Sequence, residues 1–219
     1  MKAFASLFLL CVLAACATTP QETAGQLLPP THLQCMYQAE PLGLRPDQAP
    51  FFSWWVNDSR RNATQSAWQV QVSTDSVALV QGEKLVWDSG KQPAGRAVQV
   101  PYAGEVLQPV TRYYWRVQSW DGAGKPSGFS PPAAFETGPG SWQAQWISDL
   151  RPQPTQDEAF YLDRPNTLLR RGFDLEENPI SARLFIAGLG YYEAYLNGEK
   201  VGDHVLDPGW TNFGKRTLY

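Results

Sequence analysis

Apolar and polar residues alternate along much of the middle of the chain, and this pattern predicts half-buried β-strands. In residues 67–73 (AWQVQVS), Trp68, Val70 and Val72 share one strand face, while glutamines occupy the other. No apolar pattern of helical period continues over three turns. Further strand candidates, bounded by Gly, Pro, Asn, Asp or Ser, are 51–56, 84–90, 96–102, 113–118 and 133–137. Short strands at regular spacing predict an all-β sandwich.

A second strand-like region follows the boundary at Gly138-Pro139-Gly140. It contains 168–175 and 181–203, after an expected loop at 150–166. Asn197-Gly198 supplies the two positive φ angles of a type I′ turn and predicts a hairpin. Asp207-Pro208-Gly209 predicts another turn. The apolar side chains of this region that we expect in a core are Ala182, Leu184, Ile186 and Leu189.

The first residues resemble a secretion signal. A basic Lys2 precedes a short apolar run, which is far below the roughly 20 residues that a membrane-spanning helix needs. The run ends in Leu13-Ala14-Ala15-Cys16, which resembles the lipobox of bacterial lipoproteins. We therefore expect a signal peptide over 1–15 and lipidation of Cys16, with a plain secretory signal as the alternative. The chain would then be lipid-anchored in the cell envelope, in the periplasm or at the outer membrane.

Residues 16–34 are rich in Thr, Pro and Gln without any period, and we expect a tether there. The sandwich would follow over 35–139 and the second region over 140–219. Cys11 lies in the signal region and Cys16 would carry the lipid, so Cys35 is the single cysteine left in the mature body and has no partner for an internal disulfide. A lone cysteine there favours a passive thiol over a nucleophile.

Composition narrows the classes of function. The chain has 219 residues, 43% of them hydrophobic and 18% charged, which is enough apolar material for a packed core. Its net charge of -3 provides no basic field, so nucleic acid is not an expected partner. The aromatic content of 13% suits modules that bind neutral sugars, and it equally suits ordinary sandwich cores.

Candidate catalytic residues are few. Asp88, Asp121 and Asp207 lie beside Gly, Ser or Pro, where aspartate caps turns. Glu193 alternates with tyrosines on a strand face, and His204 has no clear set of metal ligands around it. The sequence contains no HExxH motif, no paired CxxC, no GxSxG and no phosphate-binding loop. We therefore expect no catalytic residue, no metal and no cofactor in this chain.

Aromatic platforms remain as an option for binding. Most of the nine tryptophans fall at alternating strand positions, where core packing explains them. Trp210 lies in a turn and is the least core-like. We expect Trp210 and Tyr191 to be possible contacts for a carbohydrate or for a neighbouring domain.

The sandwich region resembles a fibronectin type III domain. Leu107-x-Pro109-x-Thr111-x-Tyr113-x-Trp115 is similar to the tyrosine corner of that fold, in which a Tyr hydroxyl bonds the backbone just upstream. The resemblance implies a structural role for Tyr113.

Residues 36–219 resemble the N-terminal modules of bacterial α-L-rhamnosidases. Trp87-Asp88-Ser89-Gly90 and Leu206-Asp207-Pro208-Gly209-Trp210-Thr211 carry the resemblance. It implies an immunoglobulin/fibronectin-like module followed by the incomplete start of a galactose-binding jelly-roll β-sandwich. It also implies a parent glycosidase that releases terminal α-L-rhamnose from glycans with inversion, using two carboxylates of a downstream (α/α)6 barrel. We expect this chain alone to be inactive.

Three alternatives stay open. A carbohydrate-binding or adhesion lipoprotein predicts glycan affinity that falls on Trp210→Ala. A structural spacer predicts no glycan binding. Another exo-glycosidase with similar β-modules would be told apart by the domain encoded beyond the codon for Tyr219.

Overall fold

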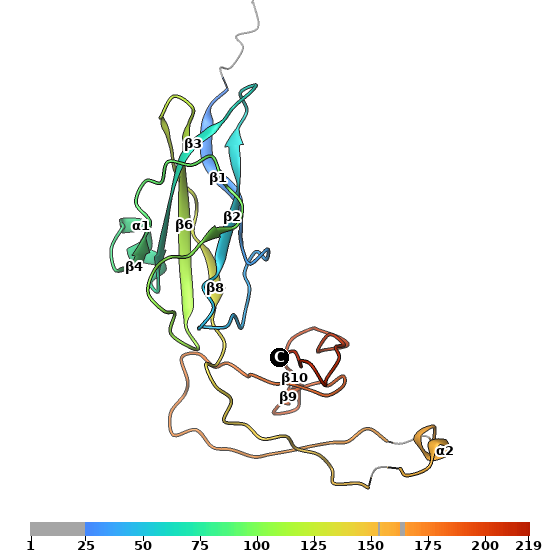
Figure 1. The fold of residues 1–219 in the computed structure, drawn as a ribbon. Helices are drawn as coiled ribbons and strands as arrows, with labels where there is room; N and C mark the ends of the chain where they lie inside the picture. Colours follow the sequence, from blue (N-terminus) through green and yellow to red (C-terminus); the bar gives the residue numbers. More distant parts are fainter. Residues whose placement is uncertain (1–24, 153, 163–164) are drawn as a thin grey trace, which may run out of the picture.

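The computed structural model describes residues 25–152, 154–162 and 165–219 (Figure 1). The expected signal peptide and Cys16 lie outside these residues. Two antiparallel sheets form a β-sandwich, and the chain after residue 140 leaves its base as a long excursion (Figure 1). The predicted all-β sandwich is confirmed.

The first sheet has three strands in the order β1-β2-β5, which are β1 (Leu27–Cys35), β2 (Phe51–Asp58) and β5 (Val100–Pro101). The second has the order β4-β3-β6-β7, with β8 also paired to β6. Its strands are β3 (Gln65–Ser73), β4 (Leu85–Asp88), β6 (Arg112–Asp121), β7 (Pro126–Phe129) and β8 (Ala133–Glu136). The predicted strands are thus confirmed, although only Val100–Pro101 pairs within 96–102.

The core lies between the two sheets and is built by the alternating positions. Val70 and Val72 of β3 are fully buried, and in β6 Trp115 is fully buried between buried neighbours on the same face. Phe52 of β2 meets Trp115 across the sandwich with ring centroids 4.4 Å apart. Each such large apolar side chain contributes about 1.5–3 kcal/mol by leaving water.

The tyrosine corner is present at the start of β6. The backbone N–H of Gln108 donates to the hydroxyl of Tyr113 at 2.8 Å, and Tyr113 and Leu107 are both buried. A backbone donor that would otherwise lack a partner at the crossover is therefore satisfied by a side chain. The structural role expected for Tyr113 is confirmed.

The expected tether is partly wrong, because Leu27–Cys35 forms β1. This strand pairs with β2 from Leu27↔Asp58 to Cys35↔Phe52, with register shifts on both sides of Thr31. Pro29 and Pro30 point to a linker in the sequence, but proline is tolerated in a strand that lies at the edge of its sheet and is bulged.

Two short helices lie in the described part of the chain, α1 (Ser76–Gln81) and α2 (Asp157–Phe160). Asp75 caps α1 by accepting from the N–H groups of Val77 and Ala78, and Gly82 ends it with φ 76°. A helix of this length shows no sustained period, so the apolar pattern does not predict it. Neither helix is long and apolar enough to cross a membrane, a finding limited to the residues described.

Residues 140–219 contain little regular structure. The hairpin of β9 (Tyr195–Leu196) and β10 (Glu199–Lys200) turns at Asn197 and Gly198, whose φ angles are 52° and 88°, as predicted. The strand expected at 168–175 has no regular secondary structure, and Leu184, expected in a core, is 60% exposed. A strand needs a neighbour to satisfy its backbone groups. Within this described region only β9 and β10 pair as strands, beside one bridge between Tyr192 and Asp207.

Candidate functional site

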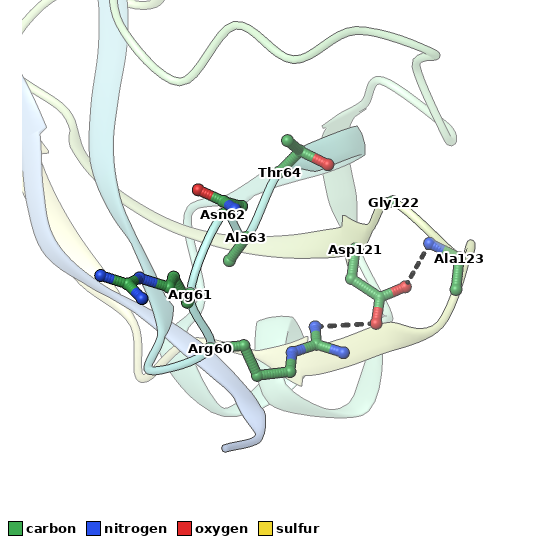
Figure 2. Close-up of a pocket in the computed structure, with 8 residues that line it drawn as sticks. All are labelled: Arg60, Arg61, Asn62, Ala63, Thr64, Asp121, Gly122 and Ala123. Carbon is green, nitrogen blue, oxygen red and sulfur yellow. Dashed lines mark hydrogen bonds and ion pairs between the residues drawn. The ribbon is translucent and has the colours of Figure 1, made fainter. Parts of the chain in front are cut away.

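A polar pocket of about 210 Å³ lies at one end of the sandwich, between the β2–β3 loop and the β6–β7 turn (Figure 2). Figure 2 shows the Arg60 guanidinium reaching the Asp121 carboxylate, which joins the two loops. The other residues that line it are Arg61, Asn62, Ala63, Thr64, Gly122 and Ala123.

The charges of Arg60 and Asp121 in this pocket are paired within the protein. Arg60 makes two hydrogen bonds to Asp58, at 2.9 and 2.6 Å, and one to Asp121 at 2.9 Å. The hydrogen bond from Arg60 lowers the pKa of Asp58, while the Lys125 N–H and then Arg60 lower the pKa of Asp121. Both carboxyl groups are therefore ionised near neutral pH and have no proton to give to a leaving group.

Asp121 also closes the β6–β7 turn. Its Oδ1 accepts from the N–H groups of Ala123 at 3.0 Å and Lys125 at 2.8 Å. The turn-capping role predicted for this aspartate is confirmed. The residues of the pocket thus have a structural role, because their hydrogen bonds join the β2–β3 loop to the β6–β7 turn.

The Trp87-Asp88-Ser89-Gly90 motif is structural as well. Trp87 packs edge-on against Tyr102 in the core, with ring centroids 5.0 Å apart. The Asp88 carboxylate accepts from the side chains of Gln69 and Gln71 and from the N–H of Gly90, each at 2.8 Å. Burial opposes ionisation of Asp88, but these hydrogen bonds outweigh it and its pKa is lowered. The motif thus joins β4 to the outer face of β3.

Three aromatic residues gather on the surface of the C-terminal region. The ring of Trp210 lies 5.7 Å from that of Tyr191 and 5.2 Å from that of Phe213, measured between centroids. Trp210 is 68% exposed and Tyr191 54% exposed. The structure therefore brings together the two binding candidates taken from the sequence. We call Tyr191, Trp210 and Phe213 the aromatic cluster.

Phe213 was not predicted. It follows Trp210 by three residues, and the side chain of Asn212 accepts the N–H of Gly214 at 3.1 Å, in a turn that has Phe213 at its centre. An Asn-x-Gly turn that brings a second ring back toward Trp210 is the signal that could have identified it. Exposed aromatic faces of this kind can stack on the apolar face of a sugar ring.

Other candidate residues are committed to structure. Glu193 accepts from Lys200 and from the hydroxyl of Tyr195, both at 2.8 Å, so it braces the β9–β10 hairpin. Burial raises the pKa of Cys35 to about 12, which keeps its thiol protonated and unreactive. His204 joins no group of three or more His, Cys, Asp or Glu side chains suited to a metal, among the residues described.

The other carboxyl groups with a shifted pKa are, like Asp58 and Asp121, stabilised in the ionised form. A glycosidase general acid needs a raised pKa so that it carries a proton at working pH. Every described Asp or Glu whose pKa clearly departs from its ordinary value has it lowered, namely Asp47, Asp58, Asp75, Asp88, Asp121, Glu136, Asp149 and Glu193.

Comparison with known protein families finds a matching domain for each of the two regions of the chain. Residues 30–141 match the Rha78A-like, N-terminal immunoglobulin domain, and residues 177–219 match the α-L-rhamnosidase N-terminal domain. An α-L-rhamnosidase of Formosa agariphila is 33% identical over 189 residues, which are 78% of this chain and 20% of that protein. The chain thus spans about a fifth of the length of this relative.

Solved structures of α-L-rhamnosidases match the chain as well. The α-L-rhamnosidase from Dictyoglumus thermophilum matches with a TM-score of 0.70 and 32% identity, over 85% of this chain and 22% of that one. The Streptomyces avermitilis α-L-rhamnosidase complexed with L-rhamnose matches with a TM-score of 0.51 and 40% identity, over 55% of this chain and 12% of that one. The chain therefore belongs to the α-L-rhamnosidase family, and it corresponds to the N-terminal β-modules of these enzymes.

Proposed function

We propose that this chain forms the non-catalytic N-terminal β-modules of an α-L-rhamnosidase, a glycoside hydrolase that releases terminal α-L-rhamnose. The order of the two matched domains, 30–141 followed by 177–219, carries the proposal. The ionised, internally bonded carboxylates of the described residues support it, because none of those with a shifted pKa is adapted to donate a proton.

The chemistry of the parent enzyme would use two carboxylates outside this chain. In an inverting mechanism one carboxylic acid protonates the leaving oxygen while the other activates water on the opposite face of the sugar. The test is proton NMR of the first product released by the polypeptide that the complete reading frame encodes. An initial burst of β-L-rhamnose supports inversion, and initial α-L-rhamnose refutes it.

We propose module boundaries that take β1 into account. The sandwich module then runs from Leu27 to about residue 139, and the start of the second module occupies 140–219. The signal peptide would cover 1–15 and a shortened tether 16–26.

We also propose that Cys16 carries a lipid that anchors the protein in the cell envelope. The lipobox-like Leu13-Ala14-Ala15-Cys16 supports this. Labelled palmitate should enter the wild-type chain, and it should not enter Cys16→Ser. Cys11→Ser is the matched control and should keep the label, whereas equal labelling of wild type and Cys16→Ser would refute the anchor.

A second candidate function rests on the aromatic cluster. Its exposed rings support contact with rhamnose-containing glycans through Trp210. Affinity electrophoresis in a rhamnose-rich polysaccharide should retard the wild-type chain, and Trp210→Ala should abolish the retardation. Trp146, equally exposed but outside the cluster, supplies the control Trp146→Ala, which should behave as wild type. Retardation that survives Trp210→Ala would exclude this site.

A further inference from the structure

The base of the sandwich is joined to the C-terminal region by an ion pair. Glu136, the last residue of β8, receives two parallel hydrogen bonds from Arg183, from Nε to Oε1 at 2.6 Å and from Nη2 to Oε2 at 2.8 Å. The two residues are 47 positions apart, on either side of the long excursion in Figure 1. Bidentate contact between Arg and a carboxylate is the most directional form of ion pair in proteins.

Glu136 depends on this partner. Its side chain is almost fully buried, partly beneath Arg183 itself, and a buried carboxylate without a counter-charge is costly. The other cation nearby is Arg112, which lies 3.9 Å from Glu136 and also contacts Glu40 at 3.4 Å. The hydrogen bonds from Arg183 are the largest cause of the lowered pKa of Glu136, so the pair is charged near neutral pH.

A second contact lies close by. The hydroxyl of Tyr219 donates to the carbonyl oxygen of Gly43 at 2.8 Å. Gly138 and Gly43 leave the space for this ring, since a Cβ built on Gly138 would overlap the Tyr219 hydroxyl oxygen. Trp142 meets the same ring edge-on with centroids 5.1 Å apart.

The sequence of the docking segment fits both contacts. Arg183 and Phe185 lie two residues apart in a segment without regular secondary structure. Arg183 reaches Glu136, and the ring of Phe185 lies 6.5 Å from that of Tyr219. Two side chains of this segment thus lie at the ion pair with Glu136 and beside the Tyr219 ring.

We propose that Glu136, Gly138 and Gly43 form a docking face for the second module, which is occupied by Arg183 and Tyr219 and holds the two modules in one fixed orientation. The sandwich then acts as a support that positions the region carrying the aromatic cluster. This proposal goes beyond the function proposed above and holds whatever sugar the parent enzyme cleaves.

A double-mutant cycle on the whole chain tests the ion pair. In urea unfolding followed by tryptophan fluorescence, Arg183→Gln should raise the unfolding equilibrium constant of the sandwich about three- to tenfold, because it removes the bidentate partner of a charged and largely buried Glu136. In the Glu136→Gln background the same change should have almost no effect, since no buried charge remains. Equal effects of Arg183→Gln in both backgrounds would overturn the proposal.

Arg183 is half exposed, so its replacement leaves the sandwich core intact and the result interpretable. Arg171→Gln, in the exposed excursion, is the matched control and should leave unfolding unchanged. Small-angle X-ray scattering provides an independent measurement. Arg183→Gln combined with Tyr219→Ala should enlarge the radius of gyration by freeing the C-terminal region, and an unchanged profile would contradict docking.

Discussion

At the scale of single residues, many polar side chains in the sandwich satisfy backbone groups that the strands leave open. The hydroxyl of Tyr113 accepts the N–H of Gln108, and Ser89 accepts the N–H of Val70 at 2.9 Å. Thr137 likewise accepts the N–H of Thr111 at 2.9 Å. Such groups cost free energy when buried without a partner, which explains why these side chains lie at crossovers and turns.

Tyr113→Phe should lower the free energy of unfolding by about 1–2 kcal/mol, because the N–H of Gln108 loses its acceptor in a partly buried place. Urea unfolding of the purified chain measures this. Tyr114→Phe is the control, since Tyr114 points to the other face of β6, and it should change stability by less than about 0.5 kcal/mol. Equal losses in both variants would remove the special role of the tyrosine corner.

Neighbouring tryptophans should behave very differently. Trp54 is 2% exposed and Trp55 is 64% exposed, because successive residues of β2 point to opposite faces. Trp54→Ala should cost about 3–5 kcal/mol of unfolding free energy, as expected for a large buried ring. Trp55→Ala should cost less than about 1 kcal/mol, and a loss as large as that of Trp54→Ala would contradict the arrangement.

At the scale of elements, alternation alone predicts the central strands well. In β6 burial alternates residue by residue, so the sequence period reports burial directly. In β3 the alternation predicts the strand but not burial on both faces, because Gln71 and Ser73 are buried as well as Val70 and Val72. The sequence does not predict β1, because its two prolines are typical of a linker. They are tolerated in an edge strand, but that β1 lies at an edge beside β2 cannot be read from the local sequence. The strand expected at 168–175 fails for a related reason, since strand pairing depends on distant chain that a local pattern does not specify.

The aromatic cluster shows the same limit. The surrounding turn residues indicate that Trp210 is not a core residue, and strand alternation indicates a surface position for Tyr191. Each residue can therefore be proposed from the sequence as a binding candidate, but their contact cannot. Their contact at 5.7 Å depends on how the chain folds back through the bridge between Tyr192 and Asp207. The same holds for Arg183, whose partner Glu136 lies in another module.

Removal of β1 tests the corrected boundary of the sandwich. A chain that begins at Cys35 should unfold at a clearly lower temperature than one that begins at Gly25, because β2 loses its neighbour from Asp58 to Phe52. Circular dichroism during heating measures the two midpoints. Equal midpoints would show that residues 25–34 are a tether after all.

At the scale of the whole molecule, the buried ion pairs make stability depend on pH. Asp58, Asp121 and Glu136 have pKa values lowered in the folded state by arginines or backbone N–H groups. Their contribution is therefore fully present above the unfolded carboxyl pKa of about 4 and is lost as the pH falls through the folded values. The urea midpoint should stay level from about pH 7 to pH 5 and fall below about pH 4.

The variant Asp58→Asn with Asp121→Asn should flatten this acid dependence, because two of the carboxyl groups no longer titrate. A wild-type midpoint that rises on acidification would mean that these carboxyl groups are not stabilised as anions.

The central claim is that this chain builds the β-modules of an α-L-rhamnosidase while the chemistry lies outside it. The most direct test is the release of chromophore from an aryl α-L-rhamnoside. The purified chain and the polypeptide from its complete reading frame would be compared at equal concentration. We predict no release above the buffer blank by the chain of 219 residues and steady release by the longer polypeptide. Turnover by the chain alone, or a longer polypeptide that leaves the α-L-rhamnoside intact, would contradict the account.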